Sequence, residues 1–571
     1  MRRWSRTYGV LVVIMAIVAG GCAPAGPPSQ AGSEAGAVSQ GQRPAGPNRV
    51  TASIMGEPAS LVARANSTQI SPPGASVLEQ LVNASLAEVN GSGALQPLLA
   101  EAVPSVENGL WKLLPDGRME TTWRIGPNVT WHDGTPFTAD DLLFTVAVDQ
   151  DKSVPMVQPK GYGYVESVVA PDPRTVTVTW KEPFIDADQM FTQGFAPPLP
   201  KHLLAATFAN DKERLLALPY WSQEFVGTGP FRVRDFQPGS TIVLQAFDRY
   251  ALGRPKIDEM EIRFILDLNT LMTNVLSGTV ELTLGRGFTI EHAIRLRDQW
   301  QDGRMDHVLR AWIVAHPQFM DPNPLVVTDV RFRRALLHGT DRQQLVDSLQ
   351  GGLSEVAHVY LPPSEPEYPA VADSVIRYAY EPRRATQMIE EIGYTKGPDG
   401  MFRDAAGGRL AVELRSNGER ITENTIIPLA DMWNRLGVAT ESVQVPPQRI
   451  ADREYMATFP GFRLMRQPNQ ASQISRSHSS LTPLPDARFV GSNYARYVNP
   501  AFDGMIDQFL TTIPREERMQ VLRNAMHHIS EQLNLMGIFY DADFTFISNR
   551  LEHVGARETV AWDVHQWQVR N

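Results

Sequence analysis

The sequence predicts an α+β protein built from several mixed subdomains. Strand-like alternation with frequent turn residues dominates up to about residue 185, whereas apolar residues at helical spacing dominate from about residue 325 onward. A chain of 571 residues is too long for a single hydrophobic core and long enough for two or three domains. The 42 glycines and 43 prolines favour many turns and long connections over a compact helical bundle.

The N-terminal residues resemble a bacterial export signal. Three arginines precede the apolar run Val10–Val18, which is too short to span a bilayer comfortably. Small residues at 19–21 then lead into Cys22, as in a lipobox, where cleavage leaves a lipid-carrying cysteine at the new N-terminus. Cys22 is the only cysteine in the chain. We therefore expect a signal peptide over 1–21 and lipidation at Cys22; the alternative is an ordinary signal peptide with an incidental cysteine.

Composition and charge narrow the possible classes of function. Residues 23–48 are rich in Gly, Pro, Ala and Gln and cannot bury enough apolar surface to fold, so 22–48 is expected to be a lipidated cysteine followed by a flexible linker. A single cysteine excludes an intramolecular disulfide and a cysteine-based zinc site. The net charge of −10 argues against a nucleic-acid binder, which needs a basic surface.

The first half of the chain alternates strands with tight turns. A strand-like alternation begins at Arg49, and Leu78–Leu86 has apolar residues at helical spacing. Turn dipeptides follow at Asn90-Gly91, Asp116-Gly117 and Asp172-Pro173. Further strands are predicted at 175–180, 231–234, 241–244 and 280–283, with a helix at 269–278.

Helices with clear end signals dominate the second half. Asp329 precedes a helical run at 330–337, and Thr340-Asp341 can cap a helix that closes at Gly351-Gly352. Pro382 stands where its fixed φ suits the start of a helix. A strand is predicted at 409–414, and helices at 424–436 and 515–533.

One stretch, Trp131–Pro136, combines His132 and Asp133 and could be interpreted as a catalytic pair. The dipeptide Asp133-Gly134 is also a strong tight-turn signal. Thr138 then stands three residues before Asp141, which is the spacing of a helix N-cap and its acidic partner. Because each of these polar residues has a structural use, we interpret the stretch as a turn followed by a capped helix.

Motifs of known catalytic sites are absent from the sequence. There is no Gly-x-Ser-x-Gly elbow, no Walker A sequence and no His-Glu-x-x-His. Gly227-Thr228-Gly229 lacks the third glycine of a dinucleotide fingerprint. We therefore expect no catalytic residues, no cofactor and no resident metal.

Several segments, in order, resemble the extracellular solute-binding proteins of the peptide/nickel type (family 5), which serve ATP-driven importers. The stretch around Trp131–Pro136 is similar to the family's aromatic-x-Asp-Gly-Thr-Pro signature. Further matching segments are Glu57–Leu61, Leu98–Glu101, Val226–Phe231, Asp329–Leu336, Thr340–Arg342, Gly491–Tyr494 and Asn499–Asp503. The resemblance covers about 49–555.

The resemblance implies a two-lobed periplasmic-binding-protein-like fold (class II, cluster C), with an extra strand-rich subdomain in the first lobe. The first lobe would comprise 49–87, 223–308 and 536–571. The inserted subdomain would comprise 88–222, and the second lobe 309–535.

The resemblance also implies a function. The chain would capture a peptide or related small solute in the cleft between its lobes by hinge closure and deliver it to an ABC permease and its ATPase. It would be an exported monomer, lipid-anchored at the outer face of the cytoplasmic membrane. Three alternatives remain open: an exported hydrolase or processing enzyme, a receptor for an oligosaccharide, metal chelate or anionic solute, and a surface sensor or chaperone.

The segment Gly461–Gln470 corresponds to one that supplies an acid for the α-amino group in peptide-binding members. Here it has no acid and carries Arg463 and Arg466 instead. Guanidinium groups favour carboxylate or phosphate partners, although both arginines could instead face solvent. Trp221 and Trp433 could stack on a ligand or belong to the core. The candidate ligand-binding residues are Gln69, Ser71, Arg463, Met465, Arg466, Gln467, Asn469, Asn493 and Tyr494.

Overall fold

A computed structural model describes residues 48–66, 72–151, 153–154, 156, 160–450, 452–555 and 560–570. These belong to one compact unit, Pro47–Asn571. The predicted signal peptide, Cys22 and the linker up to residue 47 lie outside the described residues. No helix in the described part is long and apolar enough to cross a membrane.

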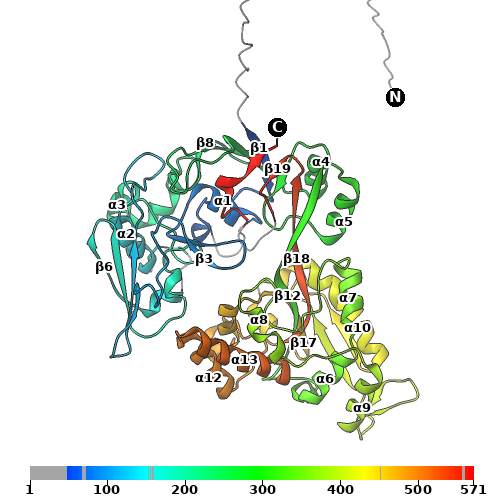
Figure 1. Cartoon of the computed structure of the whole chain (residues 1–571). Coiled ribbons are helices and arrows are strands. Elements are labelled where there is room, and N and C mark those ends of the chain that lie inside the picture. Colours follow the sequence, from blue (N-terminus) through cyan, green and yellow to red (C-terminus); the bar gives the residue numbers. More distant parts are fainter. Residues whose placement is uncertain are drawn as a thin grey trace, which may run out of the picture. The chain divides into compact units, whose positions relative to one another are not determined.

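A ten-stranded mixed sheet organises the unit, in the order β16-β15-β17-β12-β18-β11-β1-β10-β9-β8. Its strands are β1 (Arg49–Ile54), β8 (Phe231–Gln237), β9 (Thr241–Ala246), β10 (Glu259–Phe264), β11 (Leu282–Thr283), β12 (Gly303–Pro317), β15 (Ala411–Arg415), β16 (Ala439–Val443), β17 (Phe462–Pro468) and β18 (Met536–Ser548). The two long central strands, β12 and β18, pair antiparallel and run between two lobes (Figure 1). They are therefore the continuous structure that joins the lobes.

The first lobe packs α1 (Ala75–Val82), α4 (Leu268–Leu276) and α5 (Ile290–Gln299) against the β1 end of the sheet. The short strands β19 (Leu551–Glu552) and β20 (Gln568–Val569) pair antiparallel with each other and complete this lobe. Trp221 is buried in this core and donates its indole N–H to the carbonyl of Leu215, so it is a packing residue.

Helix α1 ends at Val82, four residues earlier than the predicted helix over 78–86. The chain leaves the helix there because Gly227–Gly229 packs directly on it: the backbone N–H of Gly229 donates to the carbonyl of Val82 at 3.1 Å. A Cβ at Gly229 would lie 2.4 Å from the carbonyl carbon of Val82. The glycines of this motif thus permit close backbone packing.

The residues between the β1 and β8 strands form a separate four-stranded sheet with the order β4-β5-β7-β6. Its elements, with the neighbouring hairpin and helices, are β2 (Ala87–Val89), β3 (Leu95–Pro97), β4 (Trp111–Leu113), β5 (Met119–Arg124), α2 (Ala139–Gln150), β6 (Val165–Asp172), β7 (Thr175–Trp180) and α3 (Lys201–Asn210). The predicted turns at 116–117 and 172–173 join strand pairs of this sheet, and the turn at 90–91 joins β2 to β3 in a separate two-stranded sheet. Trp123, Trp131 and Trp180 are buried in its core.

The second lobe places helices on both faces of β12, β17 and β15. Buried residues of α6 (Val330–His338), α7 (Arg342–Leu349), α9 (Pro382–Glu391) and α10 (Arg420–Leu436) form one core, and those of α12 (Pro500–Thr511) and α13 (Arg515–Gln532) form another (Figure 1). The smaller elements are α8 (Tyr368–Val371), β13 (Thr395–Lys396), β14 (Phe402–Arg403) and α11 (Arg453–Ala457). Trp433 is buried in the first of these cores and donates its indole N–H to Thr340.

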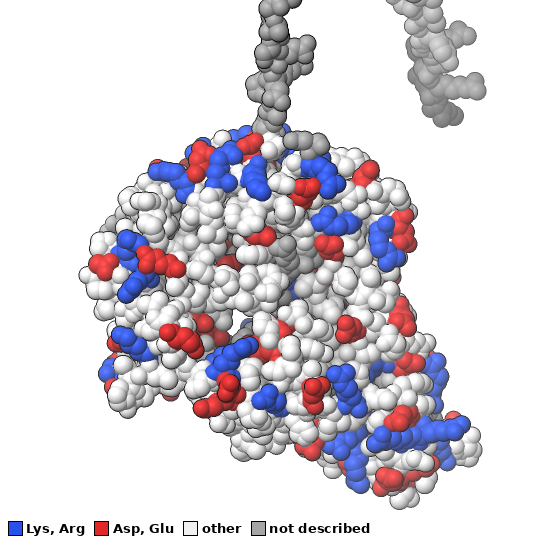
Figure 2. All heavy atoms as spheres, in the orientation of Figure 1, with Lys and Arg blue, Asp and Glu red and all other residues white. Residues whose placement is uncertain are grey.

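The predicted starts of α6, α7 and α9 are confirmed. Asp329 accepts from the backbone N–H of Arg331, Asp341 caps α7, and Pro382 is the first residue of α9. Helix α10 begins at Arg420, four residues before the predicted start. The predicted lobe boundaries at 87, 222, 308 and 535 remain a prediction. Positive and negative side chains are interspersed over the face shown in Figure 2.

Candidate functional site

The stretch Trp131–Pro136 is a structural turn. The Nδ1 of His132 accepts from the backbone N–H of Gly227 at 3.2 Å, and its Nε2 lies 3.0 Å from the carbonyl of Gly229. Burial lowers the pKa of His132 to about 4, so the ring is neutral. Asp141 accepts from the backbone N–H of Thr138, which confirms the predicted capping box. Both ring nitrogens of His132 therefore contact the backbone of Gly227–Gly229 and hold the turn against that segment.

Strand β17 divides the sequence-predicted ligand residues between its two faces. Side chains alternate along a strand, so Arg463, Met465 and Gln467 share one face and Arg466 lies on the other. In the sheet register Arg463 stands between Arg415 of β15 and His316 of β12. Gln69 and Ser71 lie outside the described residues.

The face that carries Arg463 is covered by the second lobe itself. Arg463 is 6% exposed, donates to the carbonyl of Met456 at 2.7 Å and lies 5.2 Å from the ring centroid of Tyr494. The amide oxygen of Gln467 lies 3.0 Å from Nε2 of His316. Burial and the nearby Arg415 lower the pKa of Arg463 to about 10, against the opposing effect of Tyr494.

The other candidates on this side also have partners inside the lobe. Asn469 donates to the carbonyl of Tyr360, and Asn493 donates to Tyr497 and to Thr482. Met465 packs in the core beneath α13. The structure therefore brings Arg463, Met465, Gln467, Asn469, Asn493 and Tyr494 to the interior of the second lobe, and none of them lines the cavity described next.

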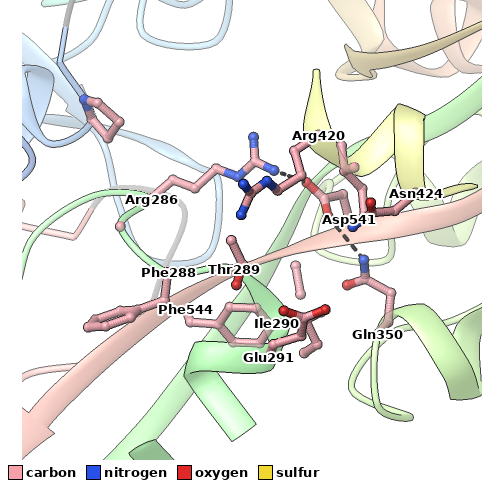
Figure 3. A pocket seen from close by; sticks show the side chains of 14 residues that line it. Arg286, Phe288, Thr289, Ile290, Glu291, Gln350, Arg420, Asn424, Asp541 and Phe544 are labelled. Atoms are coloured by element: carbon pink, nitrogen blue, oxygen red, sulfur yellow. Dashed lines mark hydrogen bonds and ion pairs between the residues drawn. The ribbon is translucent and has the colours of Figure 1, made fainter. Parts of the chain in front are cut away.

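A cavity of about 490 Å³ lies where the two lobes meet at β18. It is lined from the first lobe by the loop after β11 and the start of α5, and from the second lobe by the ends of α7 and α10. The lining residues are Pro73, Arg286, Gly287, Phe288, Thr289, Ile290, Glu291, Gln350, Arg420, Ile421, Asn424, Asp541, Ala542 and Phe544 (Figure 3). This volume lies in the range of small-molecule sites, and the mixture of apolar walls with a few convergent polar groups is typical of them.

Local structure positions the two sides of the cavity. Gly285 has a φ of 74° and packs so closely on Gly74 that a Cβ there would lie 2.3 Å from the Gly74 nitrogen. This contact fixes the loop that carries Arg286. Thr289 caps α5 by accepting from the backbone N–H of His292. On the opposite side, Arg420 is the first residue of α10.

A cluster of two aspartates and two arginines adjoins the cavity, and two of its members, Asp541 and Arg286, line it. Asp541 accepts from Arg466 at 2.6 Å, from Arg286 at 3.1 Å and from Gln350 at 3.2 Å. Asp543 lies 3.1 Å from Arg466 and 3.5 Å from Arg286. Asp541 is 3% exposed, so its carboxylate is stabilised almost entirely by these partners.

Arg466 and Asp543 differ in how burial and their partners shift their pKa values. Burial opposes the charge of Arg466, but the attraction of Asp541 and Asp543 outweighs it and raises the pKa of Arg466. Burial raises the pKa of Asp543 despite the opposing attraction of Arg466 and Arg286. The cluster therefore holds Arg466 firmly charged. In the described residues no group of three or more His, Cys, Asp or Glu side chains could hold a metal ion.

A second cavity of about 350 Å³ lies between the loop after β7 and the second lobe. Burial raises the pKa of Asp186 to about 6 and that of Asp188 to about 7, and Arg518 faces both. The backbone N–H of Ile185 donates to the carbonyl of Leu510, so this loop contacts α12 directly. This cavity has a single aromatic wall residue, Phe509, and borders a packing contact.

The sequence matches a known family over residues 94–480, which is more than half of the chain. The matching model describes bacterial extracellular solute-binding proteins, family 5 Middle. The chain belongs to this family. The predicted family resemblance is therefore confirmed.

Relatives and solved structures of family 5 agree with this assignment. A putative ABC transporter peptide-binding protein of Brucella ovis is 27% identical over 292 residues, which are 50% of this chain and 51% of that protein. The chain thus aligns with about half the length of this relative. The oligopeptide-binding protein of Thermus thermophilus, complexed with a pentapeptide, has a TM-score of 0.66 at 21% identity and covers 92% of this chain and 97% of its own. NikA of Brucella suis, in complex with Fe(III)-EDTA, has a TM-score of 0.73 at 16% identity and covers 91% and 100%. The predicted two-lobed periplasmic-binding-protein fold is confirmed.

None of the sequence-predicted ligand residues that the structure describes lines this cavity, and Arg466 reaches it only through its ion pair with Asp541. Arg286, Arg420 and Asp541 lie outside the segments that resemble the family, and they are far apart in the chain. The available signal was the charged pair Asp541 and Asp543 within an otherwise apolar run, because two acids in a buried strand require cationic partners.

Proposed function

We propose that this chain is the substrate-binding protein of an ABC importer and captures a small solute in the cavity between its lobes. The observation that carries the proposal is the origin of the lining, which comes from the first lobe at 286–291, from the second at 420–424, and from β18 between them. A solute that contacts both lobes stabilises the closed arrangement by its differential affinity for it. In this proposal 309–535 moves as a unit about β12 and β18 and closes against the rest of the chain.

The comparisons support a peptide or a related small solute. The Brucella ovis relative is named as a peptide-binding protein of an ABC transporter, and the Thermus thermophilus structure holds a pentapeptide. The Brucella suis structure holds an iron chelate. A cavity of about 490 Å³ suits solutes of this size class.

The proposed cellular arrangement follows from the N-terminal sequence and the family. The chain is exported, carries lipid on Cys22 and is tethered by residues 22–48 at the outer face of the cytoplasmic membrane. It acts as a monomer and delivers its solute to the permease subunits and their ATPase. It acts by binding without catalysis, which is supported by the structural use of both ring nitrogens of His132.

Spin-label distances test solute-driven closure. With Cys22 replaced by serine, labels at Asp298→Cys on α5 and Asp431→Cys on α10 report on the two lobes; these side chains are 59% and 60% exposed. A pool of peptides of two to five residues should shorten this distance.

A label pair within the second lobe serves as the control. Asp431→Cys combined with Asp507→Cys on α12, which is 68% exposed, should give an unchanged distance. Native mass spectrometry of the protein from its own host should show a bound small solute. An empty protein whose interlobe distance ignores every peptide would contradict the proposed function.

A further inference from the structure

The subdomain built on the β4-β5-β7-β6 sheet touches the second lobe directly. The backbone N–H of Ile185, in the loop after β7, donates to the carbonyl of Leu510 in α12 at 3.1 Å. Gly93, in the β2–β3 turn, lies so close to Pro366 that a Cβ on it would be 2.8 Å from the proline ring. Figure 1 shows α12 and α13 on the side of the second lobe nearest to this subdomain. These residues form a noncovalent junction in addition to β12 and β18, which we call the subdomain contact.

Each side of the subdomain contact places one isoleucine against the core of the other. Ile513, between α12 and α13, is 8% exposed and belongs to the same core cluster as Trp123 and Trp180 of the subdomain. Ile185 packs in turn against the second-lobe core formed by α12 and α13. Opening of the lobes about β12 and β18 would separate these surfaces and expose both isoleucines to water. Their burial therefore favours the closed arrangement.

The cavity of about 350 Å³ at this contact is strongly acidic. Asp186 and Asp188 line it from the loop after β7, and Glu365 and Glu367 line it from the segment before α8. Arg518 of α13 is the one cation among the described residues that line the cavity. The lining residues contributed by the β2–β3 hairpin, by the segment after β17 and by α12 carry no charge. Two carboxylates from each side thus meet across the contact.

Arg518 does not neutralise these carboxylates by a direct ion pair. Its guanidinium group donates to the carbonyls of Thr512 at 3.3 Å and Ile513 at 3.0 Å, and it forms no ion pair within the part of the chain that the structure describes. Glu365 accepts from the backbone N–H of Ala471. Closure therefore gathers four carboxylates around one guanidinium group. While they are ionised, like charges brought together in a partly desolvated contact oppose closure.

The two aspartates take up protons readily in this environment. Burial raises the pKa of Asp186 to about 6, with Glu367 adding to the rise and Arg518 opposing it. Burial and the charge of Asp186 raise the pKa of Asp188 to about 7, again against the effect of Arg518. In an open form both carboxyls would face water, where the pKa of an aspartate is about 3.9. The closed form therefore binds protons more tightly than the open form, and lowering the pH from 8 to 5 favours closure.

We propose that the subdomain contact is a pH-sensitive brace that holds the lobes closed more firmly when Asp186 and Asp188 are protonated. This inference rests on the proposed function, because it requires lobes that open and close. It adds a control on closure that does not depend on the solute. Because the contact is the same for every solute, protonation raises the affinity for all of them by a common factor and leaves their order unchanged.

Spin-label distances on the dialysed full chain, without added solute, test this proposal. With Cys22 replaced by serine, labels at Val169→Cys on β6 and Asp431→Cys on α10 report on the subdomain and the second lobe; these positions are 53% and 60% exposed. The ratio of short to long distances should rise at least about 10-fold from pH 8 to pH 5, as linkage gives for one carboxyl whose pKa rises to about 6. The pair Asp431→Cys and Asp507→Cys, within the second lobe, should give an unchanged distance.

Variants of the aspartates separate their titration from that of other groups. Asp186→Asn combined with Asp188→Asn should make the short distance dominate already at pH 8 and abolish the response to pH. Asp188→Glu should retain the response. Asp298→Asn on α5, where the side chain is 59% exposed, serves as the matched control and should respond like the wild type. Ile513→Ala should shift the ratio toward the long distance at every pH, because it removes apolar burial from the contact.

The outcomes distinguish this proposal from the proposed function. If the solute-free distance ignores pH, if the response persists in the double asparagine variant, or if that variant is open at pH 8, the pH-sensitive brace is wrong. Closure of the same proteins by a pool of peptides of two to five residues would then still support the proposed function. If neither pH nor any peptide changes the distance, the proposed function fails as well.

Discussion

Arg463 and Arg466 lie three residues apart on the same strand and differ in almost every physical respect. Arg463 faces the interior of the second lobe, is 6% exposed and has no ion-pair partner within the described residues. Arg466 lies on the opposite face and contacts two aspartates of β18, of which Asp541 lines the cavity. The pKa of Arg463 is lowered by burial, whereas that of Arg466 is raised by its aspartates.

The difference shows that the neighbours across a sheet decide what a buried arginine does. Arg463 stands between Arg415 and His316 in the register, and its charge is tolerated through a backbone carbonyl and an aromatic ring. Arg466 reaches carboxylates from the strand two places away. The first arginine belongs to the packing of one lobe, and the second holds Asp541, which lines the proposed binding site.

The largest expected effect on stability is that of Arg466→Met, and Arg463→Met serves as its comparison. Arg466→Met leaves two carboxylates with one guanidinium in a buried site and should lower the free energy of unfolding by about 3–5 kcal/mol. Arg463→Met removes a buried charge that has no carboxylate partner, so loss of its hydrogen bond is offset and the change should stay within about 1 kcal/mol. Urea denaturation measures both. Equal losses for the two variants would remove the distinction between the two faces.

His316, the neighbour of Arg463, sharpens the comparison through pH. Burial and the charge of Arg463 lower the pKa of His316 to about 3. Between about pH 6.5 and pH 3 the unfolded chain takes up a proton that the folded chain refuses, so this group reduces stability as the pH falls. The loss amounts to about 2 kcal/mol between pH 6.5 and pH 5.

Comparison with His316→Gln isolates this effect. The stability advantage of the wild type over the variant should shrink by about 2 kcal/mol on going from pH 7 to pH 5, as measured by urea denaturation at each pH. An advantage independent of pH would mean that His316 titrates normally in the folded protein.

The smallest expected effect is that of Arg420→Gln on stability. Arg420 is exposed and has no partner in the described part of the chain, so its removal should change the free energy of unfolding by less than about 0.5 kcal/mol. Thermal unfolding without added solute measures it. A large loss would show that Arg420 supports the fold rather than the site.

The sequence predicted the family, the fold and most helix ends, because these depend on local signals. The Asp341 cap, the Pro382 start and the turn after Asp116 each lie within a few residues of the structure they determine. The predicted start of α10 at 424 was four residues late because the local signal is weak there. Arg420 is exposed, and Pro428 interrupts the helical spacing of apolar residues.

The candidate site was only partly predictable because it is assembled by strand register. The alternation of β17 was visible in the sequence, but which face met Asp541 depended on the pairing of β17 with β12 and of β12 with β18, and the second pairing joins residues more than two hundred positions apart. The sequence left open whether Arg463 and Arg466 contact a ligand or face solvent. The ion pairs of Arg466 with Asp541 and Asp543 lead us to expect a loss of stability when that residue is replaced.

A crystal structure grown with a bound peptide of two to five residues tests the central claim most directly. The account predicts solute density in the cavity at β18, in contact with Arg286 and Arg420 and with apolar surface against Phe288 and Phe544. Density on the other face of β17, in contact with Arg463 and Tyr494, would contradict it.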